Sequence, residues 1–505
     1  MEKIKRLVFL SAIVVALVMF TSCSEKHKKY IPADSKVVGK IDVKAFIDQT
    51  DVDTDKLMED IEEYLGEDAA SIKEMGIDVK DPIYIFGRGK GSNFTFGAVA
   101  KVDDQEKVKA WFEDNAKLEI DKEGDGFDYF AEGNSAIAVN GDALVIIMAT
   151  AGDAKKEIKK IMGQEYEGDL GDNNLFEKVC DSKSFACLYA DMSIIPKEVM
   201  EMAESQAPQL KETFGDMRKM ILGIDGTCSD GICDFEYWAD SEDDDVKEKI
   251  DNMKEMFREI DEKAVETIPE DALAGIAANI DGPKCSKFIN TTLKDVDLLD
   301  QIPSEFREIY DAYLKIIGDI DGNFAGYFAA PLDIMFAVES KDNTAQRIAE
   351  LIQNLDTPSF ASFSDEPEFI EDDTAVDEDF DEEVVEEEED DDFGYDYGRP
   401  SSTIVERGDG FCYNDGSGTQ FWFGNKNGAL YFTSKESLIS SVYKKADKPI
   451  SSEMVSFATS RRCVYFLNVD KAKDFSSGLD KETKKVFNAF EEVISKIKFL
   501  TFSMK

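Results

Sequence analysis

The 505-residue sequence contains only one histidine, His27, and three tryptophans. A single imidazole in a polar N-terminal segment excludes Ser-His-Asp and Cys-His catalysis, HExxH zinc sites and histidine-ligated iron, because each needs histidine in a folded cleft. Few tryptophans also disfavour a glycan enzyme, which usually presents stacking aromatics. Trp111 falls on an amphipathic helical pattern, which predicts a core or edge position.

Basic residues are also scarce relative to acidic ones. The chain has 58 Lys and Arg against 107 Asp and Glu, a formal net charge of -49. Such a charge repels the phosphates of nucleic acids and anionic lipids, so the expected partners are basic, neutral or cationic. The 43% of apolar residues, with 35 Phe, are enough to build globular cores.

Residues 1–22 have the features of a secretion signal. Lys3, Lys5 and Arg6 precede an apolar run from Leu7 to Phe20 that is short for a membrane span, and the run ends in "FTSC". Small residues before Cys23 resemble a lipobox, which predicts acylation of Cys23, with palmitate among the expected chains. Because two or three acyl chains hold more firmly than one, we expect stable membrane anchoring, with residues 23–30 as a polar tether.

An internal repeat organises the remaining chain. The stretch "IPADSKVVGKIDVKAFID" at 31–48 recurs as "IPEDALAGIAANIDGPKCSKFIN" at 268–290, and "GDGFDY" at 124–129 recurs as "GDGFCY" at 408–413. Both copies of the "GDGF" motif are followed by an Asn-Gly hairpin signal, Asn140-Gly141 after the first and Asn427-Gly428 after the second. The order predicts two tandem related units, at 31–265 and 266–505.

Each unit combines period-two strand patterns with helical patterns of 10 to 15 residues. This mixture predicts an α+β fold in which a largely antiparallel sheet carries packed helices on one face. In "IPADSKVVGKID" we expect a strand that ends at a helix-capping Asp42, and the same role for Asp281 in the second unit. The second unit stops before a counterpart of "ICDFEYWAD" at 232–240.

The lipobox, "IPADSKVVGKIDVKAFID", "GIDVKDPIYIFG" at 76–87 and the helix after "AKVDD" at 100–104 together resemble a Bacteroidetes envelope lipoprotein family classed as a domain of unknown function. The resemblance covers nearly all of the mature chain and implies an α+β repeat, with no catalytic residue to carry over. Surface-exported lipoproteins of that group carry acidic residues after the cysteine. In this sequence Glu25 is the only acidic residue shortly after Cys23, so we expect the protein to lie on the periplasmic face of the outer membrane.

The second unit contains an acidic insertion at about 357–405. Asp365 to Asp396 includes 20 carboxylates and no Lys or Arg, which predicts a self-repelling, disordered low-complexity loop. Aromatic residues scattered through it are typical of segments that fold on a partner. Three roles remain open: a solvating loop, a weak cation store, or a tether for a basic partner.

The only metal-like spacing is "DVDTDKLMEDIE" at 51–62. It puts Asp51, Asp53, Asp55 and Glu62 at positions one, three, five and twelve of a calcium loop. Lys56 stands where such a loop needs glycine, and helix capping by Asp53 or Thr54 explains the same residues. No cofactor is therefore expected beyond weakly bound Ca²⁺.

Seven cysteines remain if Cys23 is acylated. Cys228 and Cys233 flank "SDGI"; a two-residue Asp230-Gly231 turn would place them opposite each other at a non-hydrogen-bonded pair, within reach of a disulfide. Reduced thiols are the alternative.

The leading function hypothesis is a lipid-anchored, non-enzymatic envelope protein that binds or scaffolds an unknown ligand. The alternatives are a carboxylate-dependent hydrolase of an envelope or glycan substrate, in a cleft between the units, and cation binding by the acidic loop. Carboxylates of both units converging in an apolar-walled pocket would favour the hydrolase, and smooth sheet faces would favour binding.

Overall fold

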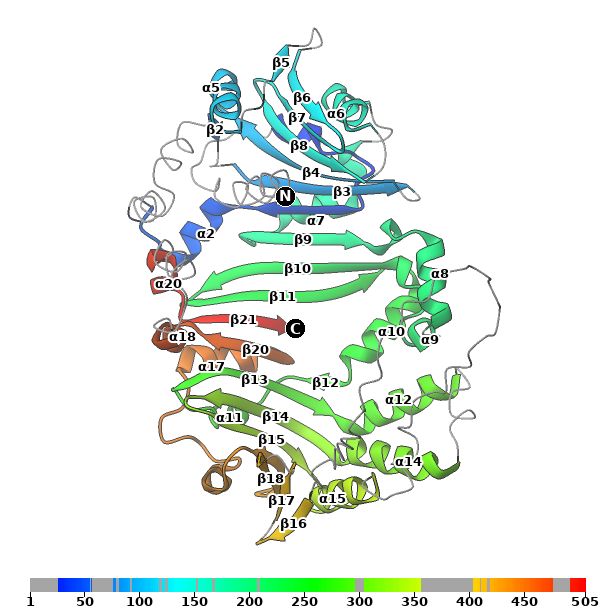
Figure 1. Ribbon diagram of the computed structural model, residues 1–505, viewed down its shortest axis with the longest axis vertical. Coiled ribbons are helices and arrows are strands. Elements are labelled where there is room, and N and C mark those ends of the chain that lie inside the picture. The colour runs from blue at the N-terminus through cyan, green and yellow to red at the C-terminus, as the bar shows by residue number, and fades with distance from the viewer. Residues whose placement is uncertain are drawn as a thin grey trace, which may run out of the picture.

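Figure 1 shows the computed structural model of the chain. The structure describes residues 26–54, 56, 76–78, 81–90, 93–116, 118, 120–122, 126–150, 153–165, 169–206, 209–295, 304–355, 403–408, 410–415, 418–475 and 491–505. The expected signal segment 1–22, Cys23 and most of the acidic insertion lie outside these residues. None of the described helices is both long and apolar enough to cross a membrane.

The fold is α+β and is built on one continuous mixed sheet (Figure 1). The first half of the sheet runs from one edge to the middle as β5 (Asp121–Lys122), β6 (Asp128–Glu132), β7 (Ser135–Val139), β8 (Ala143–Ala149), β4 (Asn93–Val102), β3 (Ile83–Lys90), β1 (Val37–Ile41), β9 (Ala186–Asp191), β10 (Met220–Ser229) and β11 (Ile232–Ser241).

The second half continues from the middle to the other edge as β21 (Phe499–Met504), β20 (Cys463–Asn468), β13 (Ala272–Asp281), β14 (Ile320–Ala329), β15 (Asp333–Ser340), β19 (Ala429–Thr433), β18 (Gln420–Lys426), β17 (Gly410–Asn414) and β16 (Thr403–Arg407). Short strands β2 (Ile77–Asp78) and β12 (Phe257–Arg258) add to β4 and β13. Among the described strands, every pairing is antiparallel except β11 with β21, where the halves meet.

α-Helices, short 3-10 segments and one π-helical segment, η2, connect these strands. In the first half they are η1 (Lys26–Tyr30), α2 (Val43–Thr50), α5 (Gln105–Trp111), η2 (Phe112–Ala116), α6 (Ala154–Gly163), η3 (Leu170–Asp172), α7 (Asn174–Asp181), η4 (Met192–Ile194), α8 (Lys197–Gln206), α9 (Gln209–Phe214), η5 (Met217–Lys219) and α10 (Asp244–Lys254). In the second they are α11 (Glu262–Val265), α12 (Gly282–Asp295), α14 (Ser304–Asp319), α15 (Thr344–Leu355), η6 (Glu436–Ser441), α17 (Ser452–Thr459), α18 (Val469–Phe475) and α20 (Glu491–Lys496).

One face of the sheet, here called the covered face, holds the two largest cores. In the first half Val38 and Phe86 pack with Ile158 of α6 and Val179 of α7. In the second half α11 and α17 pack on the sheet around Met454. All five side chains are essentially excluded from water, and their burial is the main stabilising contribution on this face.

The sequence predicted helices on one face only, and that is wrong at both ends of the sheet. On the opposite face, here called the open face, α5 packs Val108 and Trp111 against strand residues of the first half. In the second half α15 packs Ala345 and Ala349 against Val338 on the same face. α5 follows β4 and α15 follows β15 directly in the chain, and each helix folds back over the strands between its own strand and the nearer edge of the sheet.

The opening stretch forms the expected strand and cap. Val37–Ile41 is β1, and the Asp42 carboxylate accepts a hydrogen bond from the Ala45 N–H at 2.9 Å, which begins α2. Asp281 accepts from the Lys284 N–H at 3.0 Å at the start of α12. These two carboxylates therefore cap helices, as predicted.

The expected tether at 23–30 is folded over its described part. Lys26–Tyr30 forms η1, in which His27 and Tyr30 are buried and the His27 ring lies 5.6 Å from that of Tyr84. The basic residues made this segment resemble a polar linker. Their chains instead reach outward, with Lys29 pairing to Asp142, while the two rings point into the fold.

Candidate functional site: the open face of the sheet

Strand register brings apolar side chains of many strands into rows on the open face. Directly opposed residues of neighbouring strands point to the same face, so a row can be followed across the sheet. One row in the first half consists of Met148, Phe96, Gly87, Val37, Ala190, Leu222 and Ala239. The next, two residues along each strand, consists of Ile146, Ala98, Ile85, Gly39, Leu188, Ile224 and Tyr237.

A third row crosses the junction between the halves. It runs from β1 to β18 through Ile41, Ala186, Gly226, Phe235, Phe502, Tyr465, Ile276, Gly326, Phe336, Phe432 and Phe423. Phe235 of β11 and Phe502 of β21 stack with ring centroids 5.6 Å apart, so the apolar surface is continuous where the strands become parallel.

The three rows contain no charged side chain, although the chain is 33% charged residues. Their only side-chain polar groups are the hydroxyls of Tyr237 and Tyr465. Desolvation raises the pKa of Tyr237 to about 12 and raises that of Tyr465, so both stay neutral at physiological pH. The rows thus form an uncharged surface on a strongly acidic protein.

Many of these side chains remain accessible to solvent. Phe96 and Met148 are each 45% exposed, Phe502 is 47% and Tyr465 is 49% exposed. Seven further large apolar side chains of the same face exceed a third exposure: Leu188, Leu222, Tyr237, Phe336, Phe421, Phe432 and Leu467. Monomeric proteins seldom leave more than a few hundred Å² of contiguous apolar surface exposed, and these eleven residues expose on the order of 900 Å².

Glycines keep the surface flat in each half. A Cβ atom on Gly87 would lie 2.9 Å from the ring of Phe96, and one on Gly326 would lie 2.1 Å from the ring of Phe336. Each phenylalanine ring therefore lies over the backbone of the neighbouring strand, in space that only glycine leaves empty. The open face is therefore smooth at these positions, and its surface is called the floor below.

Helices border the open face on several sides. α5 and α15 lie over its two outer corners. In Figure 1 α2 lies at one side of the sheet, and α12 and α14 lie at the opposite side. In the described part of the chain, the strands between these helices cross Figure 1 without a helix in front of them.

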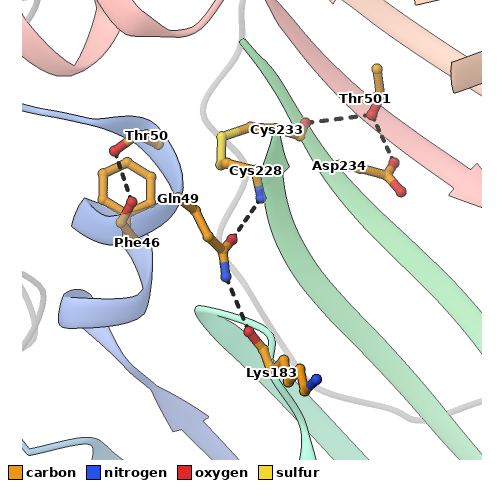
Figure 2. Close-up of a disulfide and its surroundings, with 8 residues drawn as sticks. All are labelled: Phe46, Gln49, Thr50, Lys183, Cys228, Cys233, Asp234 and Thr501. Carbon is orange, nitrogen blue, oxygen red and sulfur yellow. Dashed lines mark hydrogen bonds between the residues drawn. A yellow bond between two sulfur atoms is a disulfide. The ribbon is translucent and has the colours of Figure 1, made fainter. Parts of the chain in front are cut away.

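A disulfide lies beside α2 at one end of the face. Cys228 and Cys233 are opposed across the β10–β11 hairpin with Cα atoms 4.2 Å apart, and their sulfur atoms are bonded. The Asp230-Gly231 turn has the expected positive φ values, 52° and 80°. Figure 2 shows that the Gln49 side chain accepts from the Cys228 N–H and donates to the Lys183 carbonyl, which joins α2 to β10.

The halves share a polar cluster, but it lies on the covered face. Asp234 of β11 is 1% exposed and accepts from Thr501 and Ser503 of β21, each at 2.7 Å. Arg461 lies 3.4 Å from the same carboxylate and 3.3 Å from Glu236. With its hydrogen bonds satisfied inside packed sheet, Asp234 is suited to joining the halves rather than to reaction.

Carboxylates also line a cavity of about 630 Å³ at the other end of β1. There Asp34 pairs with Arg88 at 2.6 Å, and Glu157 pairs with the same guanidinium. Both acids belong to the first half, so this cavity is not the expected cleft between units. The Arg88 guanidinium forms ion pairs with both carboxylates, which accounts for their position in this cavity.

The calcium candidates are only partly described, because Asp55 and Glu62 lie outside the described residues. Asp51 ends α2 with a φ of 54°, and the Asp53 carboxylate accepts from the Lys56 N–H at 3.2 Å. Asp53 thus takes the predicted capping role. Within the described parts, no three His, Cys, Asp or Glu side chains are placed to hold a metal ion.

The sequence interpretation missed the open face. Its signal was present in a strand such as "CVYFLN", which carries large apolar residues at both alternating positions. Such strands are normally covered on both faces. Only the arrangement in space shows which of the two sets the described helices leave uncovered.

Fold and surface define an α+β protein in which one extended sheet presents an uncharged apolar face between bordering helices. The particular family is shown by residues 27–503, which match the model of the domain of unknown function DUF4836; the chain belongs to this family. No curated protein is significantly similar to it.

Two solved structures show weak similarity. That described as "Structure of crystal form III of TP0453" is 13% identical with a TM-score of 0.25, over 43% of this chain and 79% of that one. "Structure of crystal form I of TP0453" is 13% identical with a TM-score of 0.23, over 43% and 77%. Scores this low support no argument about function.

Proposed function

We propose that this protein acts by binding an apolar ligand on the open face of its sheet, without catalysis. The main observation that supports this proposal is the uncharged row that crosses the sheet from Ile41 to Phe423. Phe502 and Tyr465, at the centre of this row, are about half exposed. Exposing large apolar side chains to water is unfavourable and invites aggregation, so a ligand that covers them stabilises the folded protein.

We propose that the chain consists of two related units, as its internal sequence repeat suggests, and such an organisation would support binding on the open face. Counted from either edge, nine strands follow in corresponding order: β5, β6, β7, β8, β4, β3, β1, β9, β10 and β16, β17, β18, β19, β15, β14, β13, β20, β21. β11 lies between the two series and has no counterpart among the described strands of the second half. Duplicating a unit and joining the copies edge to edge doubles the length of the face.

We further propose that the chain is a lipoprotein anchored through Cys23 on the periplasmic face of the outer membrane. The sequence from 1 to 30, with its lipobox-like residues before Cys23 and a single acidic residue after it, supports this proposal. Mass spectrometry of the N-terminal peptide should find an acylated Cys23. Protease added to intact, surface-labelled cells should spare the protein, and its digestion would refute the periplasmic orientation.

Binding of Nile red, an uncharged dye that fluoresces in apolar surroundings, tests the main proposal. The full chain should bind the dye, and Phe502→Glu should weaken binding about tenfold, because it buries a carboxylate without a partner. Val405→Glu is the matched control. Val405 is 49% exposed on β16 but points to the covered-face side, opposite Cys412. Equal dye binding by all three proteins would refute the open face as the site.

The acidic insertion supports one additional candidate, weak cation binding. Its 20 carboxylates between Asp365 and Asp396 make a dense set of oxygen ligands for Ca²⁺. Calorimetric titration of the full chain and of a chain lacking 365–396 should show Ca²⁺ uptake only in the former. Identical titrations would remove this candidate without affecting the open face.

A further inference from the structure

We propose that the occupant of the open face is the pair of acyl chains of a diacyl lipid that carries no net charge. This inference rests on the proposed function and specifies the chemistry of its ligand. Three properties of the open face favour hydrocarbon chains as its ligand. The backbone groups of its described central strands are hydrogen-bonded within the sheet, its rows carry no charge, and its shape is flat and long.

The sheet offers no free backbone groups to a peptide. In the middle of the face each described strand is paired on both sides, as β9 is with β1 and β10, and β20 is with β21 and β13. A peptide laid on this floor would bury its own amides against hydrocarbon without partners, which costs free energy for each group. Acyl chains have no such groups, so this floor accommodates them without that cost.

Charge argues against the other apolar occupants. A second copy of this chain could cover the face, but each copy carries a formal charge of -49, and two copies repel each other. The same charge opposes docking on an anionic bilayer. A lipid with a zwitterionic headgroup presents uncharged chains to an uncharged floor and little net charge to the acidic surroundings.

The shape of the face fits extended chains. Between β8 and β18 the sheet has 14 strands in register, which span about 60 Å at the usual spacing between strands. An acyl chain covers about half of the ~30 Å hydrocarbon core of a bilayer, so the floor has room for chains laid across the strands. The rings of Phe96 and Phe336, lying over Gly87 and Gly326, leave that floor flat.

Native mass spectrometry of the full chain with Cys23→Ser tests this inference, because without Cys23 any acyl chain detected is bound non-covalently. After incubation with phosphatidylcholine vesicles and their removal, the protein should carry the added mass of phosphatidylcholine, released on activation. Phosphatidylglycerol vesicles, which are anionic, should load at least about fivefold less.

Two face variants and one control locate the site. Phe502→Glu and Tyr465→Glu should each reduce phosphatidylcholine loading about tenfold, since both residues are exposed at the centre of the row. Val405→Glu adds the same charge on the other side of the sheet and should load like the parent. Circular dichroism of each variant verifies that it is folded before loading is compared.

The outcomes separate this inference from the proposal it rests on. Nile red binding that Phe502→Glu abolishes, without any phosphatidylcholine loading, would overturn the lipid assignment and leave apolar binding in place. A dimer in analytical ultracentrifugation that Phe502→Glu dissolves would make a second copy the occupant and overturn it too. Absence of both dye and lipid binding would overturn both proposals.

Discussion

The two faces of one sheet differ in what their apolar side chains do. On the covered face Val38 and Phe86 are fully buried under helices, and the same face accommodates the buried carboxylate of Asp234. On the open face Phe502 and Tyr465 remain about half exposed in rows that contain no charge. The covered face therefore accounts for folding, whereas the open face retains apolar surface that folding does not use.

The proposed ligand binding would account for this difference between the two faces. In a chain with 33% charged residues, a solvent-facing position is readily occupied by a charged side chain, which would prevent aggregation. The rows exclude charge at corresponding places in both halves, at Phe96 with Gly87 and at Phe336 with Gly326. The proposed ligand binding would explain why charged side chains are absent from these positions in both halves.

The largest predicted effect separates the faces by stability. Phe86→Ala should lower the free energy of unfolding by about 4 kcal/mol, because it leaves a cavity in a closed core. Phe502→Ala, at 47% exposure, should lower it by only about 1 kcal/mol. Urea unfolding followed by circular dichroism measures both. Equal losses would show that the open face is part of the folding core and would break the comparison.

The next effect concerns the polar cluster of the covered face. Asp234→Ala should cost about 3 kcal/mol, because Thr501, Ser503 and Arg461 lose their acceptor in a buried place. Glu236→Ala is the matched control. It removes a carboxylate at a similar distance from Arg461 but in a more solvated position, and should cost below about 1 kcal/mol. Similar costs would mean that burial of this cluster is unimportant.

Local features of the fold could be predicted from the sequence. The strand at Val37–Ile41, the capping roles of Asp42 and Asp281 and the Asp230-Gly231 turn depend on neighbours within a few residues, and all are confirmed. The α+β class follows from the same local periodicities. Such features need no knowledge of distant contacts.

Features that depend on distant contacts were missed. The burial of His27 requires Tyr84, more than fifty residues away, and nothing in "SEKHKKY" indicates that contact. The open face requires strands from the whole chain to align, including the parallel pairing of β11 with β21 that joins Phe235 to Phe502. A sequence pattern shows which positions alternate but not which set is left uncovered.

A smaller effect is expected at the Cys228–Cys233 disulfide, which lies on the open-face side. Cys228→Ser with Cys233→Ser should cost about 1–2 kcal/mol, because the closed loop is short and the hairpin already holds its ends together. Unfolding with and without reductant measures this cost in the parent. A thiol count that rises by two on reduction tests whether the bond forms in the envelope, and an unchanged count would refute it.

The smallest effect is predicted at His27, on the covered-face side, and should be seen only on acidification. Its Nε2 faces the Pro82 carbonyl at 3.2 Å and must donate, so Nδ1 is the unprotonated nitrogen, buried without a hydrogen-bond partner. Desolvation is the main cause that lowers the pKa of His27, against smaller opposing contributions from Pro82 and Asp81. Protonation would put a charge and an unpaired N–H inside the fold.

Because the pKa is lower in the folded state, the unfolded chain binds the proton first. The contribution of His27 to stability is therefore complete above pH 6.5 and falls as the pH decreases below that value towards the folded pKa. His27→Gln should remove this loss. The urea midpoint of the parent minus that of the variant should therefore be smaller near pH 5.5 than at pH 7.5. Carboxylates affect both proteins alike and cancel in the difference. A difference that is independent of pH would show that η1 leaves the sheet before His27 titrates, and that this segment is not part of the covered face's core.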